Sequence, residues 1–240
     1  MKERIVLLAH GFMIHDSHDL KWFYNYVSTS EEFKGYEFKL IKLYDRSKGK
    51  TSKPKVMEKF LKNEVQGYLD LGYDVTLVGY SFSCGLVAKV ARDLNIKGVI
   101  HFAPSIKLIK TNLLKMHIDN AWKTLKLRLK YGKKKAKKIM NRTKTSGLVV
   151  LSYHIALSMI KYRKYFKSNT PFIIFRGIED TYCLQEDVVW ILKRTCSKYV
   201  KNITIHKEGW NHFFIRREEL VPLLPSIETK KFLERINIDE

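Results

Sequence analysis

Short apolar runs alternate with helical periodicity along most of the chain. Apolar runs of about four to eight residues predict buried strands, and apolar positions three or four apart predict helices that cover them. We expect strands at residues 4–9, 36–43, 73–78, 97–102, 171–175 and 202–206. We expect helices at residues 19–30, 54–71, 84–94, 185–198 and 227–236. This alternation predicts an α/β fold with a mostly parallel sheet of about six strands and helices on both faces.

Residues 105–169 interrupt this alternation. They hold two or three helical patterns, one of them basic and another, over residues 148–166, apolar and aromatic. Ligands of parallel sheets bind at the carboxyl ends of the strands, and the interruption begins at that edge. We therefore expect a helical lid at 105–169, inserted between two parts of one core at 1–104 and 170–240.

The totals suit a single domain that carries such an insertion. Of the 240 residues, 45% are hydrophobic and 12% aromatic, which is ordinary for a globular protein. No apolar stretch reaches the roughly 18 residues of a membrane span, and the first apolar run is too short for a signal peptide. The three cysteines, Cys84, Cys183 and Cys196, show no disulfide or metal spacing. We expect a cytoplasmic protein in a reducing compartment.

The formal net charge of +21 is concentrated in the predicted lid. Between Lys107 and Lys144 the sequence has 14 Lys and Arg residues and one acidic residue, Asp119. One interpretation is a solvated helix face without a partner. Another is a surface that places the protein peripherally at an anionic membrane, because Leu and Trp residues interleave with the lysines. Nucleic acid is a third, which charge alone favours and which we reject as the main interpretation because no base-reading motif accompanies it.

The stretch Gly79-Tyr80-Ser81-Phe82-Ser83 lies between a predicted strand and a predicted helix. A sharp strand-to-helix turn there would raise the Ser81 hydroxyl above the sheet edge as a nucleophile. Such a turn needs small residues two positions before and after the serine, and Gly79 and Ser83 are both small. The alternative is that Ser81 only caps the helix. We expect Ser83 to face inward and Cys84 to be a small core residue.

A base and an acid for this serine follow two later strands. A serine hydroxyl attacks when a base accepts its proton and an acid holds that base in one tautomer. Asp180 in the loop 177–180 is the expected acid, with its neighbour Glu179 as the rival. His212 in the loop 209–212 is the expected base, with a packed loop histidine as the alternative. The order Ser, Asp, His along the chain is the one expected when the serine lies in such a strand-to-helix turn.

Two backbone N–H groups are expected to hold the oxyanion of the tetrahedral intermediate. Phe82 follows the nucleophile at the start of a helix, and Phe12 follows His10-Gly11 at the end of the first strand. We expect His10 itself to make a structural hydrogen bond. The remaining histidines show no ligand spacing, so we expect no metal site and no cofactor; they include His101, His117, His154 and His206.

These motifs resemble those of the α/β-hydrolases, above all the small lidded members that include monoacylglycerol-lipase-like and serine-aminopeptidase-like enzymes. His10-Gly11-Phe12 matches the family's oxyanion loop, and residues 79–83 match its nucleophile elbow. Residues 177–180 match the G-x-x-D acid loop, and residues 209–213 match the G-x-x-H-F base loop. Residues 45–52 are loosely similar to the D-x-x-G-x-G-x-S loop. The resemblance covers essentially the whole chain except the lid.

The sequence departs from the family pattern at two places. Ser83 stands where the elbow usually has its second glycine. Thr181-Tyr182-Cys183 stands where Val-Pro usually follows the acid loop. Neither departure removes a catalytic group.

The resemblance implies the α/β-hydrolase fold and a serine hydrolase that cleaves carboxylic esters, such as monoacyl lipid or short-chain esters, through an acyl-enzyme. The expected substrate contacts are Gly11, Tyr80, Tyr153 and Leu157. A thioesterase or a small peptidase of the same fold is an alternative within this chemistry. A non-catalytic binding protein, with a basic lid for anionic partners, is the alternative from another class. The sequence leaves the oligomeric state open.

Overall fold

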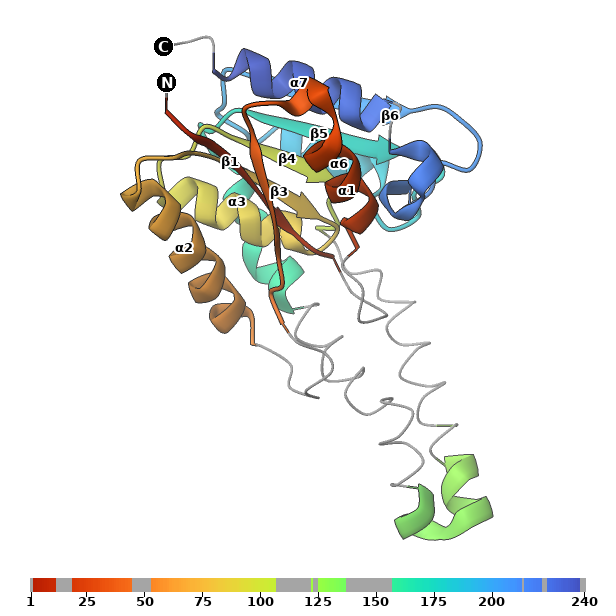
Figure 1. Ribbon diagram of the computed structural model, residues 1–240. Coiled ribbons are helices and arrows are strands. Elements are labelled where there is room, and N and C mark those ends of the chain that lie inside the picture. The colour runs from red at the N-terminus through yellow and green to blue at the C-terminus, as the bar shows by residue number, and fades with distance from the viewer. Residues whose placement is uncertain are drawn as a thin grey trace.

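A six-stranded sheet forms the centre of the structure, which is a computed structural model (Figure 1). The structure describes residues 2–11, 19–44, 53–106, 122, 125–136, 157–212, 214–221 and 224–237. The strand order is β2-β1-β3-β4-β5-β6, and every neighbouring pair is parallel. The strands are β1 (Arg4–Ala9), β2 (Glu37–Ile41), β3 (Asp74–Tyr80), β4 (Gly98–Phe102), β5 (Phe172–Gly177) and β6 (Val200–Ile205). The predicted α/β fold with a parallel sheet of this size is confirmed.

The strand register brings distant loops to one edge of the sheet. Tyr80 at the end of β3 pairs with Phe102 at the end of β4, and Phe102 pairs with Phe175 of β5. Gly177 at the end of β5 pairs with Ile205 at the end of β6. Because all strands run in one direction, the loops that follow them share the carboxyl edge, where ligands of such sheets bind.

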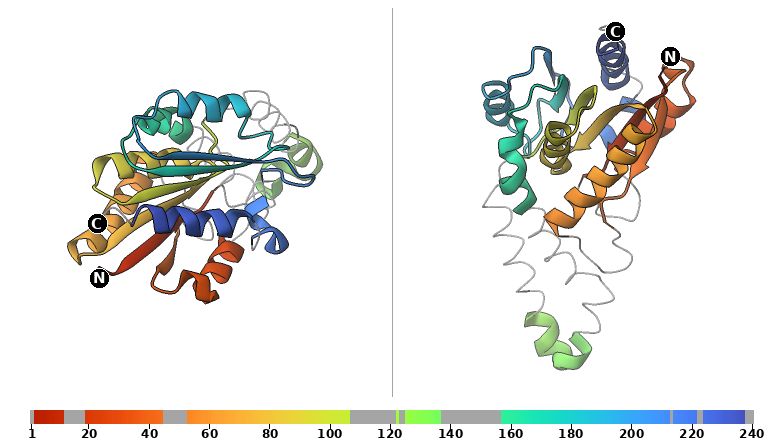
Figure 2. Two further views of the ribbon diagram at one scale, coloured as in Figure 1. Left: turned by 90° about the horizontal axis from the view of Figure 1, so that it is seen from above. Right: turned by 90° about the vertical axis from the view of Figure 1, so that its left-hand side faces the viewer.

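Helices cover both faces of the sheet, as predicted (Figure 2). α1 and α7 lie on one face, and α2, α3 and α6 lie on the other. The helices are α1 (Lys21–Thr29), α2 (Pro54–Asp70), α3 (Ser83–Asp93), α6 (Gln185–Leu192) and α7 (Leu224–Arg235). Short 3-10 helices are η1 (Glu31–Phe33), η2 (Arg163–Phe166), η3 (Phe214–Arg216) and η4 (Glu218–Leu220).

The largest boundary error of the sequence prediction concerns α6, which ends at Leu192 and not near residue 198. Thr195 and Ser197 lie in the segment for which helix is predicted. The Thr195 hydroxyl donates to the carbonyl oxygen of Ser168, and the Ser197 N–H donates to the Thr195 hydroxyl. These side-chain bonds offer the backbone an alternative to the helix, which is typical of serine and threonine.

α3 packs against the middle of the sheet and carries the chain away from the elbow. Its Gly85 lies beside Tyr162, whose Cβ would be 3.1 Å from a Cβ on that glycine. The close approach lets helical residues 157–162 pack on α3, and the buried Tyr162 hydroxyl donates to Glu58 of α2 over 2.6 Å. The end of the predicted lid is thereby tied to two helices of the core.

Within the predicted lid at 105–169, residues 125–136 and 157–162 are helical. Residues 125–136 lie apart from the sheet in Figure 1 and in the right-hand view of Figure 2, whereas 157–162 continue into η2 against α3. The domain division at 105 and 169 stays a prediction, because much of that segment lies outside the described residues. In the part of the chain that the structure describes, no helix is long and apolar enough to cross a membrane.

Candidate active site

Ser81 lies in the sharp turn between β3 and α3, and its backbone is strained. Its φ is 56°, in the left-handed region that residues with a side chain rarely adopt. The turn is held by a hydrogen bond from the Ser81 N–H to the carbonyl oxygen of Phe102, 2.9 Å long. Gly79 makes the turn possible, because a Cβ there would lie 2.9 Å from the Cα of Cys84. Strain of this kind persists only where the surrounding structure holds it, and it is concentrated at functional sites.

Ser83 is fully buried and takes over the place of the usual second glycine with a set of hydrogen bonds. Its hydroxyl accepts from the Tyr80 N–H over 2.9 Å. The same hydroxyl lies 3.1 Å from the carbonyl oxygen of Ala9 and 3.0 Å from that of Tyr80, so its proton can be donated to either. The side chain faces inward, as expected, and ties the elbow to the end of β1.

The structure brings Ser81, His212 and Asp180 together in one hydrogen-bonded series. His212 Nε2 lies 2.9 Å from Ser81 Oγ. His212 Nδ1 lies 3.0 and 2.9 Å from the two carboxylate oxygens of Asp180. All three residues are buried, with at most 8% of their surface exposed. Such a series can pass a proton from the hydroxyl to the imidazole while the carboxylate fixes the ring's tautomer.

Asp180, and not its rival Glu179, is the carboxylate that contacts the imidazole. Asp180 Oδ1 also accepts from the N–H groups of Tyr182 and Cys183, over 2.8 and 2.7 Å. Glu179 is exposed and accepts instead from the N–H of Gly209. The segment Thr181-Tyr182-Cys183, which departs from the family pattern, thus supplies two donors that hold the acid in place.

The loops that carry the acid and the base touch each other directly. A Cβ on Gly177 would overlap the carbonyl oxygen of Trp210, so only glycine fits at this position. The N–H of Glu179 donates to that same carbonyl oxygen over 3.3 Å. Beneath the acid loop, the buried Arg176 donates from Nε to the carbonyl oxygen of Cys183 over 2.6 Å. These contacts set the spacing between Asp180 and His212.

Tyr80 supports His212 from below. The tyrosine is fully buried, its ring stacks on the imidazole with centroids 5.5 Å apart, and its hydroxyl donates to the carbonyl oxygen of His212 over 3.0 Å. The ring of Tyr182 lies on the imidazole as well, at 4.9 Å. The structure gives Tyr80 this internal role in place of the expected open contact with substrate.

The end of β1 forms the other side of the site. His10 Nδ1 donates to the carbonyl oxygen of Gly11 over 2.6 Å, and its Nε2 accepts from the Leu43 N–H over 2.9 Å, so its role is structural. A Cβ on Gly11 would overlap the ring of Tyr80, which makes glycine necessary there. Phe12, the expected second oxyanion donor, lies outside the described residues.

Phe82 stands at the N-cap of α3, directly after the nucleophile. The first backbone N–H groups of a helix have no acceptor within the helix, so this position can present a donor to an anion. Among the expected substrate contacts, Leu157 is part of a described helix and is 38% exposed. Tyr153 lies outside the described residues.

The neighbouring cysteines are not suited to be nucleophiles. Burial raises the pKa of Cys84 and of Cys183 well above the usual range, because both thiols are enclosed by the protein. The thiol of Cys84 donates weakly to the carbonyl oxygen of Phe102. Since the thiolate is the reactive form, a raised pKa makes these residues inert at neutral pH.

Ser105 is a polar member of the site that sequence reasoning missed. Its Oγ lies 3.4 Å from Ser81 Oγ, and its N–H donates to the Ser81 carbonyl oxygen over 3.2 Å. The one available signal was its place directly after β4 and Ala103-Pro104, at the same sheet edge as the elbow. Across the described ranges, no three His, Cys, Asp or Glu residues are grouped so that they could hold a metal ion.

Solved structures share this architecture over nearly the whole chain. A soluble variant of monoglyceride lipase from Saccharomyces cerevisiae, in complex with a substrate analog, matches with a TM-score of 0.65 and 16% identity, over 98% of this chain and 87% of that one. An α/β hydrolase from the metagenome of lagoon sediments at Mar Chica, Morocco, matches with a TM-score of 0.62 and 18% identity, over 98% of this chain and 92% of that one. A thioesterase domain from the curacin biosynthetic pathway matches with a TM-score of 0.56 and 14% identity, over 94% of this chain and 90% of that one.

Sequence comparison adds no relative to these. No protein-family model matches the chain, and no match was found among curated proteins. The structural likeness, at this level of identity, speaks for the fold. The six parallel strands, the elbow between β3 and α3 and these structural neighbours together lead to one conclusion: the chain has the α/β-hydrolase fold.

Proposed function

We propose that the protein is a serine hydrolase that cleaves carboxylic esters through an acyl-enzyme. The observation that carries this proposal is the series from Ser81 Oγ through His212 to Asp180, with distances of 2.9 Å on both sides of the imidazole. A binding protein would have no use for a serine held in a strained backbone conformation against a base. The intact geometry therefore favours an enzyme over the non-catalytic alternative.

The proposed reaction has two stages. Ser81 Oγ forms a bond to the acyl carbon while its proton passes to His212 Nε2, and Asp180 stabilises the resulting imidazolium. His212 then gives this proton to the leaving alcohol as the bond between carbon and leaving oxygen breaks. A water molecule repeats these steps against the acyl-enzyme and releases the acid. The N–H groups of Phe12 and Phe82 are the proposed donors to the oxyanion, a role whose loss typically costs about a hundred- to a thousandfold in rate.

A monoacyl lipid or a short-chain ester is the substrate class that we propose. One structural neighbour is a monoglyceride lipase seen with a substrate analog, and the partly exposed Leu157 offers an apolar surface on the helix that packs on α3. A thioester is the second candidate, because another neighbour is a thioesterase domain and the same nucleophile serves both acyl groups.

We propose further that Trp122 and residues 125–136 form a surface for anionic membranes, which we call the basic segment. Residues 125–136 contain six Lys and Arg residues, all of them exposed, and no acidic residue. Trp122 is 59% and Leu129 is 79% exposed, and Leu125, four positions before Leu129, shares its helix face. Exposed apolar side chains among lysines favour a lipid interface, since lysines bind the headgroups while the apolar groups enter the acyl region.

A panel of esters tests the proposed function. Wild-type protein and Ser81→Ala would be compared on p-nitrophenyl esters and monoacylglycerols of increasing chain length, with the matching acyl thioesters alongside. We expect turnover by wild type that Ser81→Ala lacks, with the highest kcat/KM on an ester. Higher kcat/KM on thioesters would replace the ester assignment by a thioesterase. Absence of turnover on every acyl compound would contradict the enzyme itself.

A further inference from the structure

Ser105 brings a second hydroxyl to the nucleophile. It lies just past the end of β4, is 5% exposed, and has its Oγ 3.4 Å from Ser81 Oγ. Its backbone N–H is bonded to the Ser81 carbonyl oxygen, so the side chain is held beside the reacting atom by the main chain. Within the described part of the protein, Ser105 Oγ has no other hydrogen-bond partner.

The positions of the protons in the series decide which of the two serines donates to the other. His212 Nδ1 faces both oxygens of Asp180, which only accept, so Nδ1 carries a proton and donates. In the neutral imidazole, the form that acts as a base, Nε2 is then the acceptor, and the Ser81 hydroxyl must donate its single proton to it. The contact between the two serines can therefore be a hydrogen bond only with Ser105 as donor and Ser81 Oγ as acceptor.

We propose that Ser105 is a further catalytic residue, which donates a hydrogen bond to Ser81 Oγ in the transition states of acylation and deacylation. This inference rests on the proposed function. At 3.4 Å the bond is long in the resting protein, but Ser81 Oγ gains negative charge as its proton moves to His212 Nε2. Hydrogen bonds to charged oxygens are shorter and stronger than neutral ones, and catalytic bonds often tighten only along the reaction.

The same donor acts when the acyl group leaves. In the acyl-enzyme, Ser81 Oγ is an ester oxygen and a weak acceptor. Water adds to the acyl carbon while His212 Nε2 takes one of its protons, the bond from that carbon to Ser81 Oγ then breaks, and the oxygen receives this proton from His212. Ser105 stabilises the charge that develops on the oxygen before that proton arrives. A bond that strengthens only in the transition state raises kcat and leaves substrate binding unchanged.

The test compares Ser105→Ala and Ser105→Thr with wild type. Two reactions are followed: phosphonylation of Ser81 by a fluorophosphonate, and p-nitrophenol release in the burst and steady-state phases. Ser105→Ala keeps the backbone bond and removes only the hydroxyl, and we expect an about tenfold loss in all three rates with KM unchanged. Ser105→Thr keeps the hydroxyl donor and should retain most of the wild-type rate. Ser105→Cys keeps the volume with a weaker donor, and gives an intermediate rate even if the Ala variant fails to fold.

Ser226→Ala is the matched control, since this buried serine of α7 donates to the carbonyl oxygen of Val221 and not to a member of the site. It should lower the melting temperature and leave the rates unchanged. Wild-type rates in Ser105→Ala, or an equal loss of rate in Ser105→Thr, would overturn the role of Ser105 alone. A folded wild-type protein that reacts with neither probe would overturn this inference together with the proposed function.

Discussion

The hydroxyl of Tyr80 donates to the carbonyl oxygen of His212 over 3.0 Å, across 132 residues of sequence. The ring of Tyr80 also stacks on the imidazole, so one side chain fixes both the backbone and the ring of the base. Catalytic groups work best when neighbouring packing locks their position. Tyr80 therefore connects the elbow that carries the nucleophile to the loop that carries its base.

Tyr80→Phe should lower kcat several-fold and leave KM nearly unchanged. The ring stays on the imidazole, but one buried hydrogen bond is lost, which costs about 1 kcal/mol and loosens the loop of His212. Steady-state kinetics on an ester substrate and a thermal melt measure the two effects. The control is Tyr44→Phe, whose hydroxyl lies 3.4 Å from the Gly11 carbonyl oxygen. Equal kcat in Tyr80→Phe and wild type would contradict the positioning role.

Gly177→Ala should destabilise the protein by roughly 3 kcal/mol, because the added Cβ overlaps the carbonyl oxygen of Trp210. The overlap pushes the acid loop away from the base loop, so activity should fall further than stability explains. Urea unfolding and ester hydrolysis measure the two quantities. Gly67→Ala is the control, since Gly67 lies in α2, where an added Cβ meets no atom within 4 Å, and should gain up to about 1 kcal/mol. A Gly177→Ala variant as stable as wild type would show that the two loops are not in contact.

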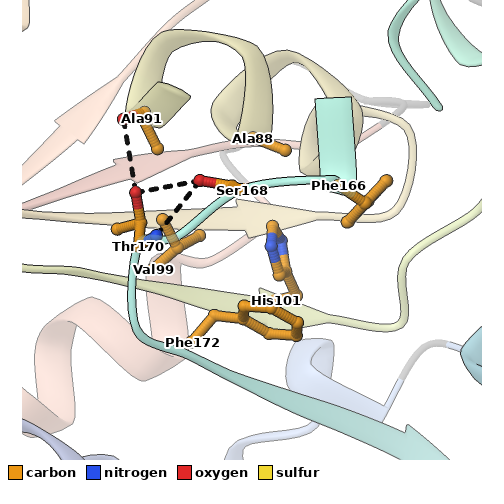
Figure 3. A pocket seen from close by; sticks show the side chains of 8 residues that line it. All are labelled: Ala88, Ala91, Val99, His101, Phe166, Ser168, Thr170 and Phe172. Atoms are coloured by element: carbon orange, nitrogen blue, oxygen red, sulfur yellow. Dashed lines mark hydrogen bonds between the residues drawn. The ribbon is translucent and has the colours of Figure 1, made fainter. Parts of the chain in front are cut away.

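His101 predicts a loss of stability in acid. It is buried between Phe166 and Phe172 beside a cavity of about 10 Å³ (Figure 3), and burial lowers its pKa from 6.5 to about 3. Among the described residues, its Nδ1 has no hydrogen-bond partner. The folded protein keeps this ring neutral, while the unfolded chain binds a proton below pH 6.5. The stability that the neutral His101 ring permits is therefore fully present above pH 6.5, and it is lost as the pH falls from 6.5 toward 3.

The slope expected from this one proton is about 1.4 kcal/mol of unfolding free energy per pH unit. His101→Leu removes the titrating group, so its stability relative to wild type should improve steadily as the pH falls. Urea unfolding of both proteins from about pH 7.5 to about pH 4.5 measures this difference. A difference that does not change with pH would mean that His101 is protonated in the fold or has the same pKa when unfolded.

The basic segment should bind vesicles that contain phosphatidylserine and ignore vesicles of phosphatidylcholine alone. Reversal of Lys126, Lys130 and Lys133 to Glu should weaken binding by roughly a hundredfold, since each lysine contributes up to about 1 kcal/mol. Added salt should also weaken binding to these vesicles, because it screens the attraction between lysines and headgroups. Sedimentation with vesicles measures the affinity, and Lys53, Lys55 and Lys59 of the α2 region, reversed together, are the charge-matched control. Equal binding by both triple variants, or preference for RNA over vesicles, would contradict the membrane surface.

The fold could be predicted well from the sequence because the relevant signals are local. β1 has the predicted bounds, since a continuous apolar run ends at His10-Gly11, and α2 begins at the predicted Pro54. The loops of Ser81, Asp180 and His212 could be predicted because each follows a strand, and parallel strands deliver such loops to one edge. Their catalytic roles remain predictions.

Other features depend on packing between distant segments and could not be predicted. Ser105 lies beside Ser81 only because β4 pairs with β3. Arg176 holds the acid loop through hydrogen bonds to backbone carbonyls, which no sequence motif predicts. Tyr80 was expected to contact substrate, but its direction is decided by Gly11 and His212, which lie far away in sequence. The choice between Asp180 and Glu179 likewise needed the position of the imidazole.

Whether Ser81 is a nucleophile activated by His212 decides whether the protein is a serine hydrolase. Labelling with a fluorophosphonate probe, followed by mass spectrometry of the labelled peptide, answers this question, with Ser81→Ala and His212→Ala as comparisons. We expect rapid labelling on Ser81, none in Ser81→Ala, and a rate at least about a thousandfold lower in His212→Ala. A folded wild-type protein that stays unlabelled with and without anionic vesicles, or that carries the label on another residue, would contradict the assignment.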